Sequence, residues 1–135
     1  MDRNLQILGL AKKAGLLAVG SEDTGTAARM GKAQLVISTN DTSESALSRA
    51  RNNAGIGRAL HIVVPYTSFE IGNVSGRGSP GTVAILDTGL AACFMRGLAK
   101  TAPERYGGPA ELLARKARAQ TECKRRSLSG KRRTV

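Results

Sequence analysis

The sequence predicts an α/β protein, a three-layer α/β/α sandwich around a small four-stranded mixed sheet, followed by a basic C-terminal extension. Short β-runs alternate with longer segments of helical periodicity, which is the order typical of a sheet covered by helices. The core must be aliphatic, because 41% of the 135 residues are hydrophobic but only 3% are aromatic. One β-run, "QLVIS", has a continuous apolar centre, as expected for a strand buried on both faces.

The chain begins with a predicted helix and a predicted strand. Leu5, Leu8 and Ala11 recur at helical spacing, and Gly15 follows as a helix stop. Residues 16–19 form a short β-run that ends at a glycine.

A second helix is predicted over about residues 22–31. Ser21 is its candidate N-cap, and Glu22 and Asp23 stand in its first turn, where the helix dipole favours anions. The strand with the continuous apolar centre follows at residues 34–38.

The third helix is predicted over about residues 42–54. Asp41 and Glu44 form a start similar to a capping box, and Gly55 ends the helix. The third strand is predicted at residues 60–64.

The last elements of the sandwich surround a glycine-rich loop. A short helical segment over residues 68–73 leads into this loop, and the fourth strand is predicted at residues 82–86. The closing helix is predicted over residues 88–100. Its apolar stripe consists of Leu90, Phe94 and Leu98.

A hinge is predicted after this domain, which spans residues 1–102. Its signals are Pro103, Gly107, Gly108 and Pro109. Residues 103–135 then form an extension with a short helix, "AELLARKARAQ", and a partly disordered basic tail, "KRRSLSGKRRTV".

The formal net charge of +11 is unevenly distributed. Residues 1–102 hold 11 Lys and Arg against 7 Asp and Glu, whereas residues 103–135 hold 10 against 3. An excess of this size favours polyanionic partners, nucleic acid first, although it is also compatible with a merely basic protein surface. The scarcity of aromatic residues disfavours folds that stack bases on an exposed aromatic sheet.

The residues favour neither a catalytic site nor a metal centre nor a membrane span. Cys93 and Cys123 lack C-x-x-C spacing, His61 is the only histidine, and no apolar run approaches the roughly 20 residues of a transmembrane helix. No catalytic Ser/His/Asp set and no P-loop is present. We therefore expect a cytoplasmic protein that is not an enzyme, with no cofactor, no metal and no small-molecule substrate.

The stretch "SGRGSPGTVAIL" matches the dinucleotide-binding pattern G-x-G-x-x-G at Gly76, Gly78 and Gly81. That site needs a strand before the glycines and a helix after them, and here the order is inverted. Pro80 also removes one amide donor. Two interpretations remain: a tight surface turn, or a loop whose backbone approaches a partner closely, with Arg77 as the adjacent cation.

Two blocks of the sequence resemble a known family. "LGLAKKAGLLAVGSEDTGTAARMGKAQLVIS", followed by "NDTS", and then "IGNVSGRGSPGTVAILDTGLA" are similar to the small bacterial YlxQ proteins. These belong to the kink-turn-binding ribosomal protein superfamily, which includes the L-seven-Ae, L-thirty-e and Gadd-forty-five-like proteins. The resemblance covers about residues 5–98 and is weakest across residues 45–67.

The resemblance implies the same α/β/α fold and an RNA site made from two neighbouring loops, here residues 20–26 and 76–82. In related proteins the first loop carries a G-x-N-E-x-x-K pattern that reads tandem sheared G·A pairs. The second loop packs around a flipped-out nucleotide. From the residues alone, the first loop is better explained as an ordinary helix start than as a binding loop.

Carried over position by position, Gly20 matches the family glycine, and Asp23 stands at the glutamate position. Glu22 stands at the asparagine position and Thr26 at the lysine position, so that one amide donor and one cation are absent. The candidate RNA-binding residues are Gly20, Ser21, Glu22, Asp23, Thr26, Arg29, Lys32, Gly76, Arg77, Gly78, Ser79 and Gly81.

The resemblance and the charge together predict an RNA-binding protein that recognises a kink-turn or a related kinked internal loop. The expected partner is structured RNA, with association with the ribosome or the translation machinery, and the protein is expected to act as a monomer. The basic tail is expected to add nonspecific affinity. The alternative is a protein-interaction adaptor on the same fold with weak nonspecific RNA binding.

Overall fold

Helices and strands alternate along the chain in the order that the sequence predicts. The computed structural model describes the backbone of residues 3–76 and 78–133, and the side chains of residues 3–76 and 78–121. In chain order the elements are α1 (Arg3–Lys13), β1 (Leu17–Val19), α2 (Ser21–Arg29), β2 (Leu35–Ser38), α3 (Glu44–Ile56), β3 (Leu60–Val63), α4 (Ser68–Ser75), β4 (Thr82–Ile85), α5 (Thr88–Thr101) and α6 (Pro103–Arg133).

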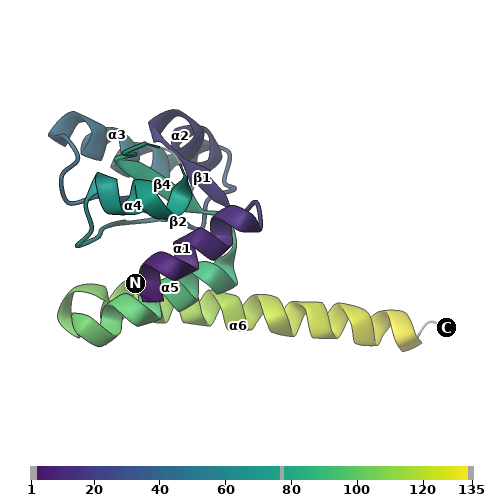
Figure 1. Ribbon diagram of the computed structural model, residues 1–135. Helices are drawn as coiled ribbons and strands as arrows, with labels where there is room; N and C mark the ends of the chain where they lie inside the picture. The colour runs from purple at the N-terminus through teal and green to yellow at the C-terminus, as the bar shows by residue number, and fades with distance from the viewer. Residues whose placement is uncertain (1–2, 77, 134–135) are drawn as a thin grey trace.

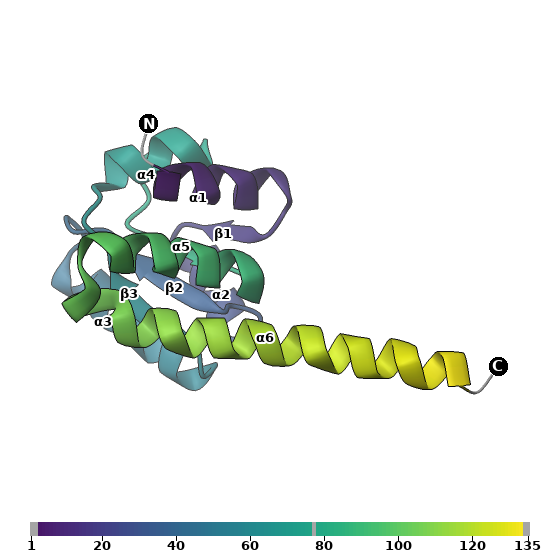
Figure 2. The same cartoon turned by 90° about the horizontal axis from the view of Figure 1, so that it is seen from below.

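The four strands form one mixed sheet with the order β1-β4-β2-β3. β2 and β3 are parallel, whereas β4 is antiparallel to both of its neighbours, β1 and β2. Helices α2 and α3 cover one face of the sheet, and α1, α4 and α5 cover the other (Figures 1 and 2). The structure therefore confirms the predicted three-layer sandwich.

The two faces of the sheet are packed with side chains of different size. Leu35 and Ile37 of β2 point to the α1 and α5 side, where they join Leu8 and Phe94 in a large apolar core. The alternate residue, Val36, points to the α2 and α3 side. There it packs almost entirely against alanines: Ala27, Ala28, Ala33, Ala50, Ala54 and Ala84. The side chains buried between the sheet and these two helices are consequently small, since an alanine side chain ends at Cβ.

Two helix starts differ from the sequence-based expectation. The N-cap of α2 is Gly20, and Ser21 is the first helical residue and makes no capping hydrogen bond. The N-cap of α3 is Ser43, whose hydroxyl accepts from the Ala46 amide at 3.2 Å. Asp41 instead accepts from the amide and hydroxyl of Ser68, at 3.0 and 2.9 Å. A tertiary partner therefore competes successfully with the local cap that the sequence predicts.

Asp41 ties the start of α4 to the loop that follows β2. Hydrogen bonds from the side chains of Thr39 and Ser68 hold the pKa of the Asp41 carboxyl below its ordinary value. Asp41 therefore fixes the geometry at the edge of the sheet where β2 and β3 end.

The C-terminal extension also differs from the expectation. The predicted hinge residues lie inside α6, which contains Pro109. The helical backbone continues to Arg133, whereas a short helix and a partly disordered tail were expected. The first part of α6 packs on α5, and the remainder projects beyond the rest of the molecule (Figures 1 and 2). Buried Leu113 and Tyr106, whose hydroxyl donates to the Val63 carbonyl at 2.9 Å, provide contacts that offset the helix-breaking residues.

His61 of β3 is a titratable residue that is partly buried in the sheet. Its Nε2 lies 2.9 Å from the hydroxyl of Ser38, which is fully buried on the neighbouring strand. Burial, and then the positive charge of Arg51, lower the pKa of the imidazole from its ordinary 6.5.

Stability should fall as the pH is lowered through the range below about 6.5. The unfolded chain binds a proton at His61 before the folded protein does, so acid shifts the equilibrium towards the unfolded state. Urea unfolding midpoints between pH 7.5 and 5.5 measure this effect. The variant His61→Gln should lose less stability over the same range. An equal loss in both proteins would assign the pH dependence to other groups.

Gly57, the residue just after α3, lies very close to the backbone of Ala28 in α2. A Cβ built on Gly57 would lie 1.6 Å from the carbonyl oxygen of Ala28. The φ of Gly57 is −88°, which any residue adopts, so the requirement for glycine is steric rather than conformational.

Gly57→Ala should therefore destabilise the protein by about 1–3 kcal/mol or more, because backbone atoms would have to move apart. Gly55→Ala is a matched control, because a Cβ there meets no atom within 4 Å. That substitution lies within helix α3 and should stabilise by about 0.5–1 kcal/mol. Chemical denaturation of the two variants compares them directly. Equal changes in the free energy of unfolding for Gly57→Ala and Gly55→Ala would contradict the close contact at Gly57.

Candidate functional site

The two loops singled out in the sequence are directly hydrogen-bonded to each other. The amide of Gly20 donates to the carbonyl of Thr82 at 2.9 Å, where β1 ends and β4 begins. The buried hydroxyl of Thr24 lies 3.5 Å from the same carbonyl and 3.4 Å from that of Ala18. The pairing of Val19 with Val83 continues this contact into the sheet. The first loop therefore meets the last residue of the second, Thr82, where β1 ends and β4 begins.

The first loop is a sharp turn from strand to helix. Gly20 has φ 95° and ψ 157°, a conformation that is essentially restricted to glycine. Ser21, Glu22 and Asp23 form the first turn of α2 and are exposed. Their backbone amides stand at the positive end of the helix dipole, without a side-chain cap.

The second loop starts at the end of α4. Gly76 is the left-handed C-cap of this helix, with φ 74°, and Gly78 also has positive φ, whereas Arg77 lies outside the described residues. Ser79 is exposed. Gly81 packs against the neighbouring chain segment, since its Cβ would lie 2.7 Å from the hydroxyl of Thr42. These glycines thus make two distinct kinds of contribution, a reversal of the backbone and a close packing contact.

The remaining candidate residues of α2 point in different directions. Thr26 is exposed, and so is Lys32, which lies beyond the end of the helix. Arg29 faces α3, where its guanidinium donates to the amide oxygen of Asn53 at 3.2 Å. The structure therefore separates Arg29 from the Thr26 surface.

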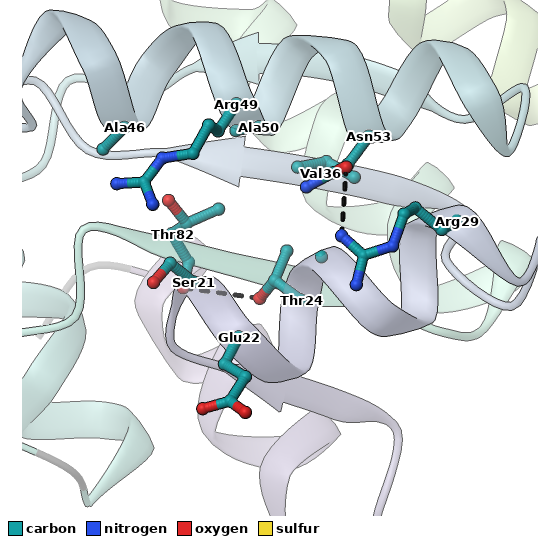
Figure 3. Close-up of a pocket in the computed structure, with 11 residues that line it drawn as sticks. Ser21, Glu22, Thr24, Arg29, Val36, Ala46, Arg49, Ala50, Asn53 and Thr82 are labelled. Atoms are coloured by element: carbon teal, nitrogen blue, oxygen red, sulfur yellow. Dashed lines mark hydrogen bonds between the residues drawn. The ribbon is translucent and has the colours of Figure 1, made fainter.

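A pocket of about 280 Å³ lies between α2 and α3, next to the junction of the two loops (Figure 3). Its floor is apolar, with Val36 of β2 and Ala50 of α3. Its rim is polar. The lining residues are Ser21, Glu22, Thr24, Gly25, Arg29, Val36, Ala46, Arg49, Ala50, Asn53 and Thr82. The small side chains of this layer leave the space open, because they are too short to fill it.

Sequence reasoning missed Arg49 and Asn53 of α3. In Figure 3 the side chain of Arg49 extends towards Ser21 and Thr82, whereas Asn53 meets Arg29. A signal was present, because Arg49 and Asn53 lie on the same helical face as the buried Ala50. Polar residues in an otherwise apolar stripe often mark a site.

Charges of both signs surround the junction. Glu22 and Asp23 stand at the start of α2, and Arg29 and Arg49 line the pocket. Within the described part of the chain, no cluster of three His, Cys, Asp or Glu side chains has the geometry to hold a metal ion. No described helix carries an apolar stretch long enough to span a membrane. The arrangement is suited to contacts with a partner that carries both hydrogen-bond donors and negative charge.

Comparison with known proteins identifies the fold. No family model matches the sequence, and no curated protein matches it either. The structure is similar to 154 chains of solved structures. One is a protein of unknown function from Bacillus halodurans, with a TM-score of 0.65 and 23% sequence identity, over 72% of this chain and 97% of that chain. A likeness at this level establishes the fold alone.

Gly20→Ala should cost about 1–3 kcal/mol of stability, because alanine is strained at φ 95° and ψ 157°. Gly76→Asn is a suitable comparison, since asparagine tolerates the left-handed conformation at φ 74° and ψ 12°. Gly76→Asn should lower the free energy of unfolding by only a few tenths of the loss expected for Gly20→Ala. Urea denaturation of both variants distinguishes the two kinds of turn. A loss as small for Gly20→Ala as for Gly76→Asn would contradict this difference.

Proposed function

We propose that this protein binds structured RNA at a kink-turn or a related kinked internal loop. The observation that carries the proposal is the hydrogen bond between Gly20 and Thr82, at 2.9 Å. It joins the two loops that, in the superfamily the sequence resembles, form the RNA site. A composite surface of this kind can contact both sides of a bent RNA at once.

Carboxylates at the start of α2 supply selectivity in this proposal. Glu22 and Asp23 are exposed, and the side chain of Glu22 points away from α3 (Figure 3). Guanine presents N–H donors on its base edges, some of which remain free in a sheared G·A pair. A carboxylate accepts these hydrogen bonds, and a good bidentate contact discriminates between bases by roughly 1–3 kcal/mol.

Cations supply the affinity. The chain carries a net charge of +11, of which residues 103–135 contribute 10 Lys and Arg against 3 Asp and Glu. The described α6 backbone extends this basic segment beyond the rest of the molecule (Figures 1 and 2). Contacts between such a segment and phosphates strengthen binding to any RNA without selecting its sequence.

The wider proposal is that the protein is a cytoplasmic member of the YlxQ group that acts as a monomer with the ribosome or the translation machinery. It acts by binding rather than by catalysis. The α/β/α fold and the two joined loops support this assignment, together with the sequence blocks around residues 5–38 and 71–92.

The proposal predicts a preference for a kink-turn RNA over a control RNA whose G·A pairs are replaced by Watson–Crick pairs. The free-energy difference should be roughly 1–3 kcal/mol, measured by gel shift at one salt concentration. Asp23→Asn should reduce this preference. Glu104→Gln should leave it unchanged, because Glu104 occupies the first turn of α6, on the other side of the sheet. Equal affinity of the unmodified protein for the two RNAs would refute specific recognition.

A further inference from the structure

Arg49 brings a positive charge to the junction of the two loops from a separate helix. It lies on α3 and lines the α2–α3 pocket, and its side chain reaches towards Ser21 and Thr82 (Figure 3). The residue is exposed. Among the described side chains, the ion pairs within 4.0 Å join Glu111 to Arg115 and Arg118, and none neutralises Arg49. Its guanidinium is therefore available to an external anion.

Two more residues of the lining are also suited to an anionic group, and the acidic residue of the lining, Glu22, has its side chain directed away from α3 (Figure 3). Arg29 stands further along the rim, where Asn53 holds its guanidinium at 3.2 Å, and this contact reduces the freedom of the side chain. The hydroxyl of Ser21 lies at the same rim, beside the uncapped first turn of α2. A planar guanidinium fits a phosphate with paired N–H donors, and an ordered one loses less entropy on binding.

The pocket places an arginine of α3 beside α2, a helix that contains no lysine. The α2 residues Ser21, Gly25 and Arg29 recur every fourth position and face the pocket, whereas Thr26 lies outside its lining. Thr26 stands where related proteins place a lysine. The structure thus brings a cation from α3 close to the loop that lacks one on α2.

We propose that the α2–α3 pocket binds a backbone phosphate of the bound RNA, with Arg49 as the principal contact. The cation absent at Thr26 is thereby replaced from α3. This inference rests on the proposed RNA-binding function and assigns a second helix to the same interface. The pocket, at about 280 Å³, is near the lower limit of roughly 300–1,000 Å³ for small-ligand sites, so it accommodates a phosphate and adjoining ribose better than a whole cofactor.

Arg49→Gln and Arg51→Gln form a matched pair that tests the contact. Both residues are exposed arginines of α3, but Arg51 does not line the pocket. Arg49→Gln should weaken binding of a kink-turn RNA roughly tenfold and lower the slope of log K against log salt by about 0.7–0.9, the value for one phosphate. Arg51→Gln should change the affinity less than about twofold. Equal losses in the two variants would overturn the proposal.

Titration with inorganic phosphate separates this inference from the proposed function. Phosphate at millimolar concentration should shift the ¹⁵N–¹H signals of Ser21, Glu22 and Asp23, and the shifts should disappear in Arg49→Gln but persist in Arg51→Gln. Shifts that depend on Arg49 would support the pocket even if kink-turn RNA and its control bind equally. Absence of any shift in the unmodified protein, with equal RNA affinity in both variants, would exclude a phosphate site.

A mononucleotide distinguishes an RNA phosphate from a free nucleotide. Uridine monophosphate should produce the same shifts as inorganic phosphate, at similar millimolar concentrations, because the RNA supplies the remaining contacts. Saturation at micromolar concentration, with RNA affinity unaffected by Arg49→Gln, would make the pocket a small-molecule site and overturn its assignment to RNA.

Discussion

The placement of β4 between β1 and β2 is the constraint on which the candidate site depends. Because β4 is antiparallel to both neighbours, its first residue lies beside the last residues of β1 and β2. Gly20 and Thr82, far apart in the sequence, are therefore joined through backbone atoms at 2.9 Å. The amide of Thr39, which follows β2, donates to the carbonyl of Gly81 at 3.0 Å. Backbone hydrogen bonds therefore join the ends of β1 and β2 to the start of β4. The sheet, rather than either loop, thus determines that a composite surface exists.

The contrast between the two helical layers has a direct consequence for chemistry. Phe94 and Leu8 fill one side of the sheet, whereas the α2–α3 side is packed with alanine. Alanine and glycine allow the two helices to touch at Gly57, but they cannot fill the space near the start of α2. Interiors are normally close-packed, so a pocket with polar rim residues is a site where stability has not been maximised.

The sequence predicted the candidate site only in part. Both loops were singled out through the family resemblance, because each is one continuous segment of the chain, and a hydrogen bond between Gly20 and Thr82 joins them in the structure. The helical face that carries Arg49 and Asn53 could be recognised from the sequence, but its approach to α2 could not, since it depends on how the two helices pack on the sheet. The expected Asp41 cap was wrong because Asp41 bonds Ser68, a residue of another helix start. Local cap signals do not reveal tertiary competitors.

The amino-acid pattern by itself determined the order of the elements, the buried β2 strand and the charge of the C-terminal segment. Periodicity and composition are local properties, so they can be recognised without knowing which elements are neighbours. Only the tertiary structure decided that residues 103–109 are helical, because burial of Tyr106 and Leu113 outweighs the local cost of glycine and proline. It also decided that a cation from α3 stands beside the two loops, because packing between distant segments determines which side chains share a surface.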